Sequence, residues 1–344
     1  MMQNMIRARA PLRLGLAGGG TDVSPFCDRY GGNVLNATID RYAYAILEQT
    51  DERRCRFEAA DQNSADELML DADLSERGVL PLHRAVYRRI IEQFHGGHRI
   101  PVHMVTFCDA PVGSGLGSSS TLVVAMVQAY SEWLNLGLDD YQVADLAFQI
   151  ERVDCGFQGG RQDQYSAAFG GFNFMEFYDH NRALINPLRI QDRVRCELEA
   201  SLLLFYTGVS RKSAEIIEAQ SRNIDSGSEA ALEAMHGLKR EAHSMKECLL
   251  KGDFDGLVRS MRLGWESKKR SASAVSTAEI DRIYERALAA GALAGKVSGA
   301  GGGGFMMFFV TPARRMAVIE ALRQCGGEVS NCHFTDHGAQ AWRA

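Results

Sequence analysis

A segment rich in glycine and serine is the part of this sequence best suited to hold phosphate groups. It comprises Pro111, Val112, Gly113, Ser114, Gly115, Leu116, Gly117, Ser118, Ser119 and Ser120. Glycines at alternate positions let the backbone turn tightly and approach a ligand closely. The apolar stretch 118–134 predicts a helix, and the unpaired N–H groups and positive dipole end of its first turn would face this loop. The segment therefore predicts an anion cradle for nucleotide phosphates, in which the serines either cap the helix or bind Mg²⁺.

Two acidic residues, Glu151 and Asp163, could complete a site for phosphoryl transfer. Such chemistry needs one carboxylate to hold a metal ion and another to orient or deprotonate the attacking hydroxyl. Glu151 is expected near the end of a helix that begins with a capping box formed by Asp139 and Gln142. Asp163 lies just past the Gly159–Gly160 turn. The alternative is that both carboxylates are ordinary surface or capping groups.

Near the start of the chain, a predicted strand over residues 5–17 runs into a tight polar turn. The strand carries Arg13, whose guanidinium could neutralise the charge that develops on a transferring phosphoryl group. Asp22 could accept hydrogen bonds from two sugar hydroxyls, although an aspartate in a turn also commonly binds its own backbone. The complete turn comprises Gly18, Gly19, Gly20, Thr21 and Asp22.

Two familiar nucleotide-binding motifs are excluded by their context. The pair Gly295-Lys296 is followed by Val297, so the hydroxyl residue of a phosphate-binding G-x-x-x-x-G-K-[ST] loop is missing. A G-x-G-x-x-G pattern occurs over residues 299–304, but the strand predicted over 305–310 follows it. A dinucleotide-binding fingerprint requires a helix at that point, because the pyrophosphate binds at the helix N-terminus.

The elements that must position these residues fall into two parts. At about 150 residues per domain, a chain of 344 residues suggests two domains, and we expect them to comprise residues 1–190 and 191–344. No Pro- or Ser-rich linker separates them, so tight packing between them is expected. Further strands are predicted over 33–49 and 102–107 in the first part. In the second part we expect a strand over 202–207, helices within 212–290, a helix starting at Pro312 and two closing strands.

Charge and composition exclude several classes of protein. With 38 basic and 43 acidic residues, the net charge of −5 lacks the broad positive field that binds nucleic acid or an anionic membrane. The longest apolar runs fall far short of the roughly 18 residues that span a bilayer, and Arg7, Arg9 and Arg13 interrupt any signal-peptide core. Eight cysteines without a C-x-x-C pair are typical of reduced thiols. We therefore expect a cytoplasmic protein without a nucleic-acid or membrane partner.

Taken in order, three glycine-rich segments resemble the three motifs of the GHMP kinase superfamily. They are Pro11-Leu12-Arg13 with residues 18–22, then residues 111–120, then residues 295–305. They span nearly the whole chain, so the match is more specific than any single loop. Residues 17–22, 159–165 and 338–342 are similar to the branch that phosphorylates D-glycero-D-manno-heptose 7-phosphate. Galactokinases carry Glu-His where this chain has Gly19-Gly20, which makes galactose a poor candidate substrate.

The resemblance implies an α+β fold of two domains with the active site in the cleft between them. It implies that ATP binds with its phosphates on the loop over residues 113–119, and that Ser119 and Glu151 hold Mg²⁺. Asp163 falls at the position of the catalytic base, and Arg13 would stabilise the transferring charge. The implied sugar contacts are Gly18, Gly19, Gly20, Thr21, Asp22 and Arg161, together with Gly301 and Gly302 of the third motif, which closes over substrate and phosphates.

The implied reaction transfers the γ-phosphoryl group of ATP to the anomeric hydroxyl of heptose 7-phosphate, giving the 1,7-bisphosphate. The phosphate already on this sugar needs basic or N–H-rich contacts at the far end of the pocket. Candidates are Arg41, Arg161, Arg211, Lys212 and the run Lys268-Lys269-Arg270. Alternatives are a kinase for fucose or an N-acetylhexosamine, a decarboxylase similar to mevalonate diphosphate decarboxylase, and a non-catalytic sugar or ATP sensor. The presence of both Glu151 and Asp163 argues against a sensor, and a homodimer is compatible with the sequence.

Overall fold

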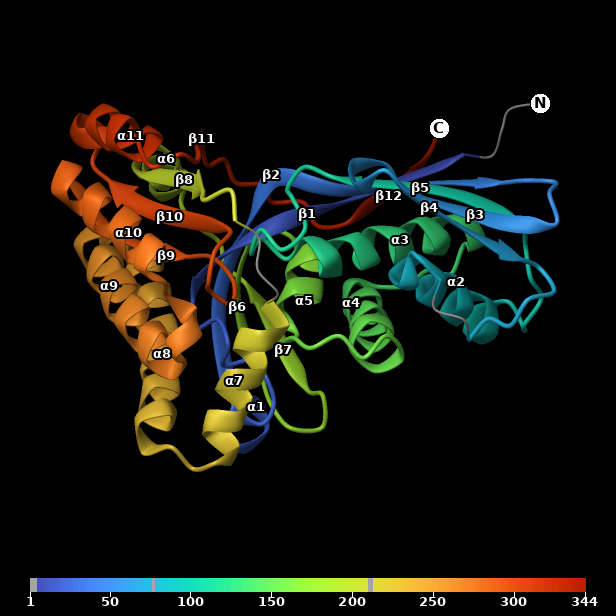
Figure 1. The fold of residues 1–344 in the computed structure, drawn as a ribbon, viewed down its shortest axis with the longest axis horizontal. Coiled ribbons are helices and arrows are strands. Elements are labelled where there is room, and N and C mark those ends of the chain that lie inside the picture. The colour runs from blue at the N-terminus through green and yellow to red at the C-terminus, as the bar shows by residue number, and fades with distance from the viewer. Residues whose placement is uncertain (1–4, 76–77, 210–212) are drawn as a thin grey trace.

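The computed structural model describes residues 5–75, 78–209 and 213–344, which form two β-sheets accompanied by helices (Figure 1). The larger sheet has eight strands in the order β12-β1-β2-β5-β3-β4, while β6 pairs with β2 and β7. These strands are β1 (Ile6–Ala17), β2 (Gly32–Gln49), β3 (Arg54–Ala59), β4 (Ser64–Met69), β5 (Val102–Cys108), β6 (Phe172–Phe177), β7 (Ala183–Pro187) and β12 (Gln340–Arg343). The smaller sheet has the order β11-β8-β10-β9 and consists of β8 (Leu202–Tyr206), β9 (Ala292–Val297), β10 (Phe305–Val310) and β11 (Glu328–Asn331).

The helices accompany the two sheets as two groups (Figure 1). Below the larger sheet lie α2 (Pro81–Phe94), α3 (Ser118–Leu134), α4 (Asp140–Phe148) and α5 (Gln162–Phe169), and the short α1 (Phe26–Tyr30) follows β1. The later helices are α6 (Asp192–Ser201), α7 (Ser213–Asp225), α8 (Glu229–Lys251), α9 (Phe254–Ser271), α10 (Ala278–Ala290) and α11 (Arg315–Arg323). Among the described residues, no helix is both long and apolar enough to cross a membrane.

Strand β1 connects the two parts of the molecule. In its first half, buried Ile6 and Ala8 alternate with exposed Arg7, as expected when one face of a strand packs on a core. From Ala10 onward both faces are buried. Leu14 belongs to an apolar cluster that includes Leu204 of β8, so the smaller sheet covers the face that β1 would otherwise present to water. This shared core explains the absence of a linker.

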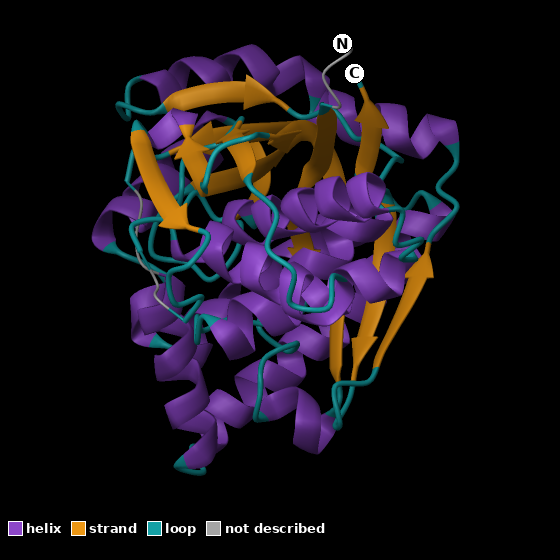
Figure 2. Ribbon diagram, turned by 90° about the vertical axis from the view of Figure 1, so that its right-hand side faces the viewer, coloured by secondary structure: helices purple, strands orange, loops and turns teal. Residues whose placement is uncertain are grey.

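The local predictions agree closely with the structure near the site. The predicted helix over 118–134 is α3, and the capping box at the start of α4 is present, with Gln142 N donating to Asp139 Oδ1 at 2.8 Å. The helix predicted from Pro312 begins as a single 3₁₀ turn, and α11 starts at Arg315. The α+β class is confirmed. The domain boundary at residue 190 stays a prediction. The last strand, β12, pairs with β1 and so belongs to the larger sheet, although it lies beyond residue 190 (Figure 2).

Candidate active site

The three glycine-rich segments meet at one pocket between the two parts of the molecule. Its walls come from β1 and the turn after it, the loop before α3, residues 158–163, helices α7 to α9 and residues 296–300. Backbone hydrogen bonds join these walls: Arg13 N donates to Leu116 O at 3.2 Å, and Phe305 N donates to Ser114 O at 2.8 Å. Segments separated by about one hundred residues or more are thus held in direct contact.

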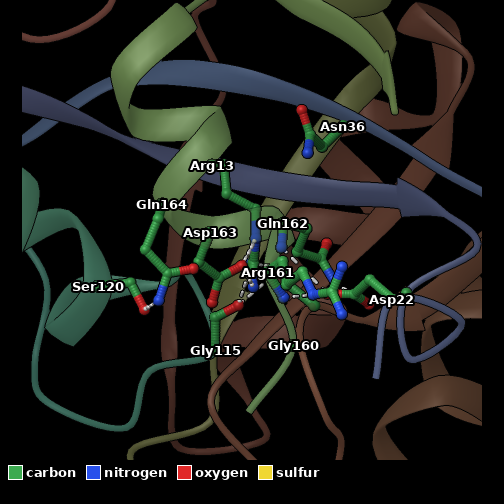
Figure 3. Close-up of polar contacts among 12 residues, drawn as sticks. Arg13, Asp22, Asn36, Gly115, Ser120, Gly160, Arg161, Gln162, Asp163 and Gln164 are labelled. Carbon is green, nitrogen blue, oxygen red and sulfur yellow. Dashed lines mark hydrogen bonds and ion pairs between the residues drawn. The ribbon is translucent and has the colours of Figure 1, made fainter. Parts of the chain in front are cut away.

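Arg13 and Asp163, which both line this pocket, form an ion pair (Figure 3). The Nε and Nη2 atoms of Arg13 lie 2.8 and 2.7 Å from the same oxygen, Oδ1 of Asp163. Arg13 Nη1 also donates to Gly115 O at 2.6 Å, which ties the pair to the glycine loop. Asp163 stands in the first turn of α5, where the helix dipole favours a negative charge, and its side chain is 20% exposed. A ligand in the pocket can therefore reach this carboxylate.

The glycines of the loop are required by its shape. Gly113, Gly115 and Gly117 have φ values of 74°, 82° and 80°, a backbone conformation that favours glycine. A Cβ on Gly115 would lie 2.5 Å from Ser298 O, and one on Gly117 would lie 3.1 Å from Asp163 Cγ. The loop can approach both the third glycine segment and Asp163 only because it lacks side chains there. It is the kind of cradle in which backbone N–H groups bind phosphate.

The residues predicted to bind nucleotide divide into two groups. Gly113, Gly115, Gly117, Ser118 and Ser119 line the pocket, whereas Pro111, Ser114, Leu116 and Ser120 lie outside its lining. The residue at the N-terminal cap of α3 is Gly117, and within the described chain no side chain caps this helix. The interpretation of the serines as helix caps is therefore wrong.

Glu151 contacts the first turn of α3, and its side chain is fully buried. It stands on the π-helical turn η2 (Gln149–Asp154) that extends α4. Its Oε1 accepts a hydrogen bond from Ser119 Oγ at 2.8 Å, and its Oε2 accepts bonds from Ser120 Oγ at 2.6 Å and Gln164 Nε2 at 2.7 Å. Glu151 thus connects the serines of the loop before α3 to the helix that carries Asp163.

The Ser119–Glu151 pair fits a magnesium ion by its chemistry. A hydroxyl and a carboxylate are hard oxygen ligands, and Mg²⁺ is commonly held by one or two carboxylates together with phosphate oxygens and water. Ser119 lines the pocket, and binding would exchange its hydrogen bond to Glu151 for the ion. Across residues 5–75, 78–209 and 213–344, no cluster of three or more His, Cys, Asp or Glu could hold a metal by itself. An ion here would therefore need further ligands, such as phosphate oxygens or water.

Asp22 anchors the turn that leads to Asp163. Its buried carboxylate accepts hydrogen bonds from Gly20 N, Arg161 N, Gln162 N and Gln162 Nε2, at 2.9 to 3.1 Å. A Cβ on Gly160 would lie 1.9 Å from Asp22 Oδ2, so the close approach depends on that glycine. A sugar hydroxyl has to replace one of these four bonds to reach Asp22. Its predicted contact with sugar stays a prediction.

Of the remaining predicted sugar contacts, some line the pocket and others lie outside its lining. Gly18, Gly19 and Gly20 line the pocket, while Thr21 is buried and its single hydroxyl hydrogen lies between Gly18 O and Asn33 O, at 2.8 and 2.9 Å from Oγ1. The Arg161 guanidinium faces Tyr178 O at 3.1 Å and Asp28 at 3.4 Å. Gly302 N donates to Val275 O at 2.8 Å, and Gly301 packs on Val275 as well. Arg161, Gly301 and Gly302 are outside the pocket lining, so direct substrate contact by them stays a prediction.

Sequence reasoning missed two cationic residues of the pocket. Lys296 Nζ donates to Gly15 O at 2.8 Å and Leu16 O at 3.0 Å, and burial lowers the pKa of this lysine to about 7. Arg152 Nη1 lies 3.3 Å from Glu151 Oε1, and its Nη2 donates to Ser120 Oγ at 3.2 Å. Their positions in the sequence were the available signal: Lys296 is the second residue of the third glycine segment, and Arg152 directly follows Glu151.

Comparisons with known proteins agree with this geometry. The GHMP kinases N terminal domain matches residues 82–171, and the GHMP kinases C terminal region matches residues 245–328. The chain is 46% identical over 338 residues to D-glycero-alpha-D-manno-heptose 7-phosphate kinase of Campylobacter jejuni subsp. jejuni serotype O:2, covering 98% of this chain and 99% of the relative.

Two solved structures are similar over nearly all of both chains. One is a D-glycero-D-manno-heptose 1-phosphate kinase from Bacteroides thetaiotaomicron, with 41% identity, a TM-score of 0.80, and coverage of 98% of this chain and 99% of the other. The second is a putative sugar kinase from Campylobacter jejuni, with 43% identity, a TM-score of 0.81 and full coverage of both chains, 100% each. The named sugars carry their phosphate at different positions, so the acceptor has to be tested directly.

Proposed function

Because the chain belongs to the GHMP kinase family, we propose that it transfers the γ-phosphoryl group of ATP to the anomeric hydroxyl of D-glycero-D-manno-heptose 7-phosphate. The product is the 1,7-bisphosphate, with ADP as the leaving group. The observation that carries this proposal is the Arg13–Asp163 pair beside the glycine loop, which puts a reachable carboxylate next to a phosphate cradle. The full-length similarity to a heptose 7-phosphate kinase supports this choice of acceptor.

Each group at the centre of the pocket has a role in this reaction. Asp163 accepts the proton of the anomeric hydroxyl as that oxygen bonds to the γ-phosphorus and the bond from phosphorus to ADP breaks. Arg13 holds Asp163 Oδ1 in position and offsets the negative charge of the transferring group. Backbone N–H groups of residues 113–119 bind the phosphates. When bound by Ser119 and Glu151, Mg²⁺ supplies further neutralisation of phosphate charge.

The rest of the assignment follows from the same proposal. Gly18, Gly19, Gly20 and Asp22 would face the sugar, and residues 1–190 and 191–344 would act as the two domains that enclose both substrates. ATP and Mg²⁺ are the required small molecules, and a kinase that uses ATP would act in the cytoplasm. The homodimer stays an untested prediction.

The experiment that tests this function measures ADP release against a panel of sugars. The panel contains heptose 7-phosphate, heptose 1-phosphate, unphosphorylated heptose, fucose and an N-acetylhexosamine. We expect the highest kcat/KM with heptose 7-phosphate, and a ³¹P spectrum of the product with a new phosphate on the anomeric carbon. Preference for an unphosphorylated hexose would replace this proposal with another sugar kinase. Binding without any turnover would replace it with a sensor.

A further inference from the structure

Two lysine side chains are buried beside the proposed sugar site. Lys268 of α9 is 6% exposed, lines the pocket and donates from Nζ to Gly19 O at 2.7 Å. Lys296 of β9 lies further back along β1 and donates to Gly15 O and Leu16 O. An ammonium group has three N–H donors, so Lys268 keeps two for another partner and Lys296 keeps one.

The charge of Lys268 has no paired counter-ion within the part of the chain that the structure describes. Its hydrogen bond to Gly19 O goes to a neutral carbonyl, and no described carboxylate lies within ion-pair distance of Nζ. The nearby Asp22 carboxylate is occupied by four other donors. Burial lowers the pKa of Lys268 to about 8; the negative charge of the nearby Asp22 acts in the opposite direction, and repulsion from Arg13 adds to the lowering. A buried charge without a partner is costly, and it is retained where an anionic ligand supplies the partner.

Lys268 contacts a different segment from Arg13, although the two cations are close enough in the pocket to repel each other. Arg13 contacts the phosphate loop at Gly115, whereas Lys268 reaches the turn beyond the end of β1. Strand residues advance by about 3.3 Å each, so the backbone from Arg13 to the end of β1 at Ala17, which has a register shift between Gly15 and Ala17, spans at most roughly 13 Å. An acceptor whose hydroxyl lies at Asp163 would extend along this strand end, with its far end near Gly19 and Gly20.

The other described basic candidates for this contact are engaged outside the pocket lining. Arg41 donates to Ser330 Oγ, and Arg161 donates to Tyr178 O. Lys269 pairs with Glu266, and Arg270 donates to Ser267 Oγ. Arg211 and Lys212 lie outside the described residues. Of the named candidates within the described chain, Lys268 is therefore the one that faces the ligand space.

We propose that Lys268 binds the phosphate that the acceptor sugar already carries, and so selects phosphorylated heptose over free heptose. This inference rests on the proposed function, because it assigns the far end of the same pocket. The space around Gly20 supports the assignment. A Cβ on Gly20 would lie 3.1 Å from Lys268 Nζ and 3.5 Å from Gln220 Oε1. A side chain at position 20 would enter the space next to the ammonium group, and glycine leaves that space to the ligand.

The test compares wild type, Lys268→Met and the neighbouring control Lys269→Met on heptose 7-phosphate and on unphosphorylated heptose. Losing one charged hydrogen-bond donor to a phosphate lowers kcat/KM roughly 10- to 100-fold. We expect this loss for Lys268→Met on the phosphorylated sugar through a higher KM, and a much smaller loss on the free sugar. Lys269→Met should keep the wild-type ratio between the two sugars.

The outcomes separate this inference from the proposed function. If wild type itself does not prefer heptose 7-phosphate, the proposed function fails before any variant is measured. If wild type has the preference and Lys268→Met keeps it, the inference is wrong. An equal fall in kcat on both sugars would also overturn it, because Lys268 would then act on the transferring phosphoryl group. Should the Met variant fail to fold, Lys268→Gln replaces it, since an amide can still donate to Gly19 O.

Discussion

At the scale of single residues, Asp163 has the surroundings of a base that is held in one orientation. Both contacts from Arg13 go to Oδ1, so the second oxygen is the one available to a substrate hydroxyl. A positioned general base contributes about 10²- to 10⁴-fold to a rate. We therefore expect Asp163→Asn to lower kcat at least about 100-fold while the Kd for ATP changes little. Single-turnover kinetics measures the rate of the chemical step, and nucleotide titration measures the Kd for ATP. Near-normal turnover of Asp163→Asn would show that Asp163 is not the base.

Glu151 gives a second prediction at this scale. Its oxygens already accept hydrogen bonds from Ser119 and Ser120, so an amide in its place should preserve packing but weaken the binding of a cation. We expect Glu151→Gln to raise the Mg²⁺ concentration needed for half-maximal activity by roughly 10-fold or more. A Mg²⁺ titration at saturating ATP measures this. Glu132→Gln, at a surface pair with Arg343, is the control, and an unchanged Mg²⁺ requirement in Glu151→Gln would exclude Glu151 as a ligand.

The buried charge of Lys268 predicts how stability depends on pH. Its pKa is lowered from 10.5 in the unfolded chain to about 8 in the folded protein. Between these values the unfolded chain binds more protons, so the folded state gains stability as the pH rises from 8 towards 10.5. Below pH 8 the cost of burying the charge is present in full. Lys268→Met should therefore be more stable than wild type at pH 7, by roughly 1–3 kcal/mol, and this advantage should shrink towards pH 10.

Urea unfolding without ligands at several pH values measures this difference. Lys269→Met serves as the control, because its side chain pairs with Glu266 near the surface and its replacement should change the free energy of unfolding by less than about 0.5 kcal/mol. A stability difference between Lys268→Met and wild type that does not vary with pH would show that the ammonium is not desolvated as the geometry implies.

At the scale of elements, the loop before α3, which we propose binds phosphate, is shaped by contact with the third glycine segment. In Gly115→Ala the new Cβ would lie 2.5 Å from Ser298 O at a φ of +82°. A non-glycine residue in this conformation costs about 1–3 kcal/mol, and the contact with Ser298 adds to that. We expect a lower free energy of unfolding and a KM for ATP at least about 10-fold higher.

A matched control separates the backbone effect from the contact. Gly97 has a φ of +78°, but a Cβ there would meet nothing within 4 Å. Gly97→Ala should therefore show the conformational cost alone, with an unchanged KM for ATP. Equal effects of the two substitutions on KM would mean that the contact with Ser298 does not shape the loop.

The same elements show what could be predicted from sequence. Helix α3 and the capping box of α4 were predicted correctly, because apolar periodicity and caps are local signals. The hairpin of β3 and β4 was not predicted, since its strands are short and carry many charged residues. The convergence of the three glycine segments was expected only through resemblance to a family. Contacts such as Lys296 with Gly15 join residues 281 positions apart, and no local pattern specifies them.

At the scale of the whole molecule, the pocket depends on a core that belongs to both sheets. Leu12 and Leu14 of β1 share one apolar cluster with Leu204 of β8 and Met307 of β10. The last strand, β12, also pairs with β1, with Ile6 opposite Arg343. Both features place residues from beyond position 190 around the strand that carries Arg13. The orientation of Arg13 therefore depends on the chain as a whole.

This dependence predicts that residues 1–190 do not form a stable domain alone. Without residues 191–344, the face of β1 that carries Leu12 and Leu14 is open to water, and one edge of the strand loses its partner β12. Exposing large apolar side chains costs about 1.5–3 kcal/mol each, so a few of them equal the stability of a typical domain. We expect the fragment 1–190 to lack a cooperative urea transition, and a mixture of fragments 1–190 and 191–344 to regain part of the activity. A cooperative transition of fragment 1–190 alone would show that the first sheet is independent of the shared core.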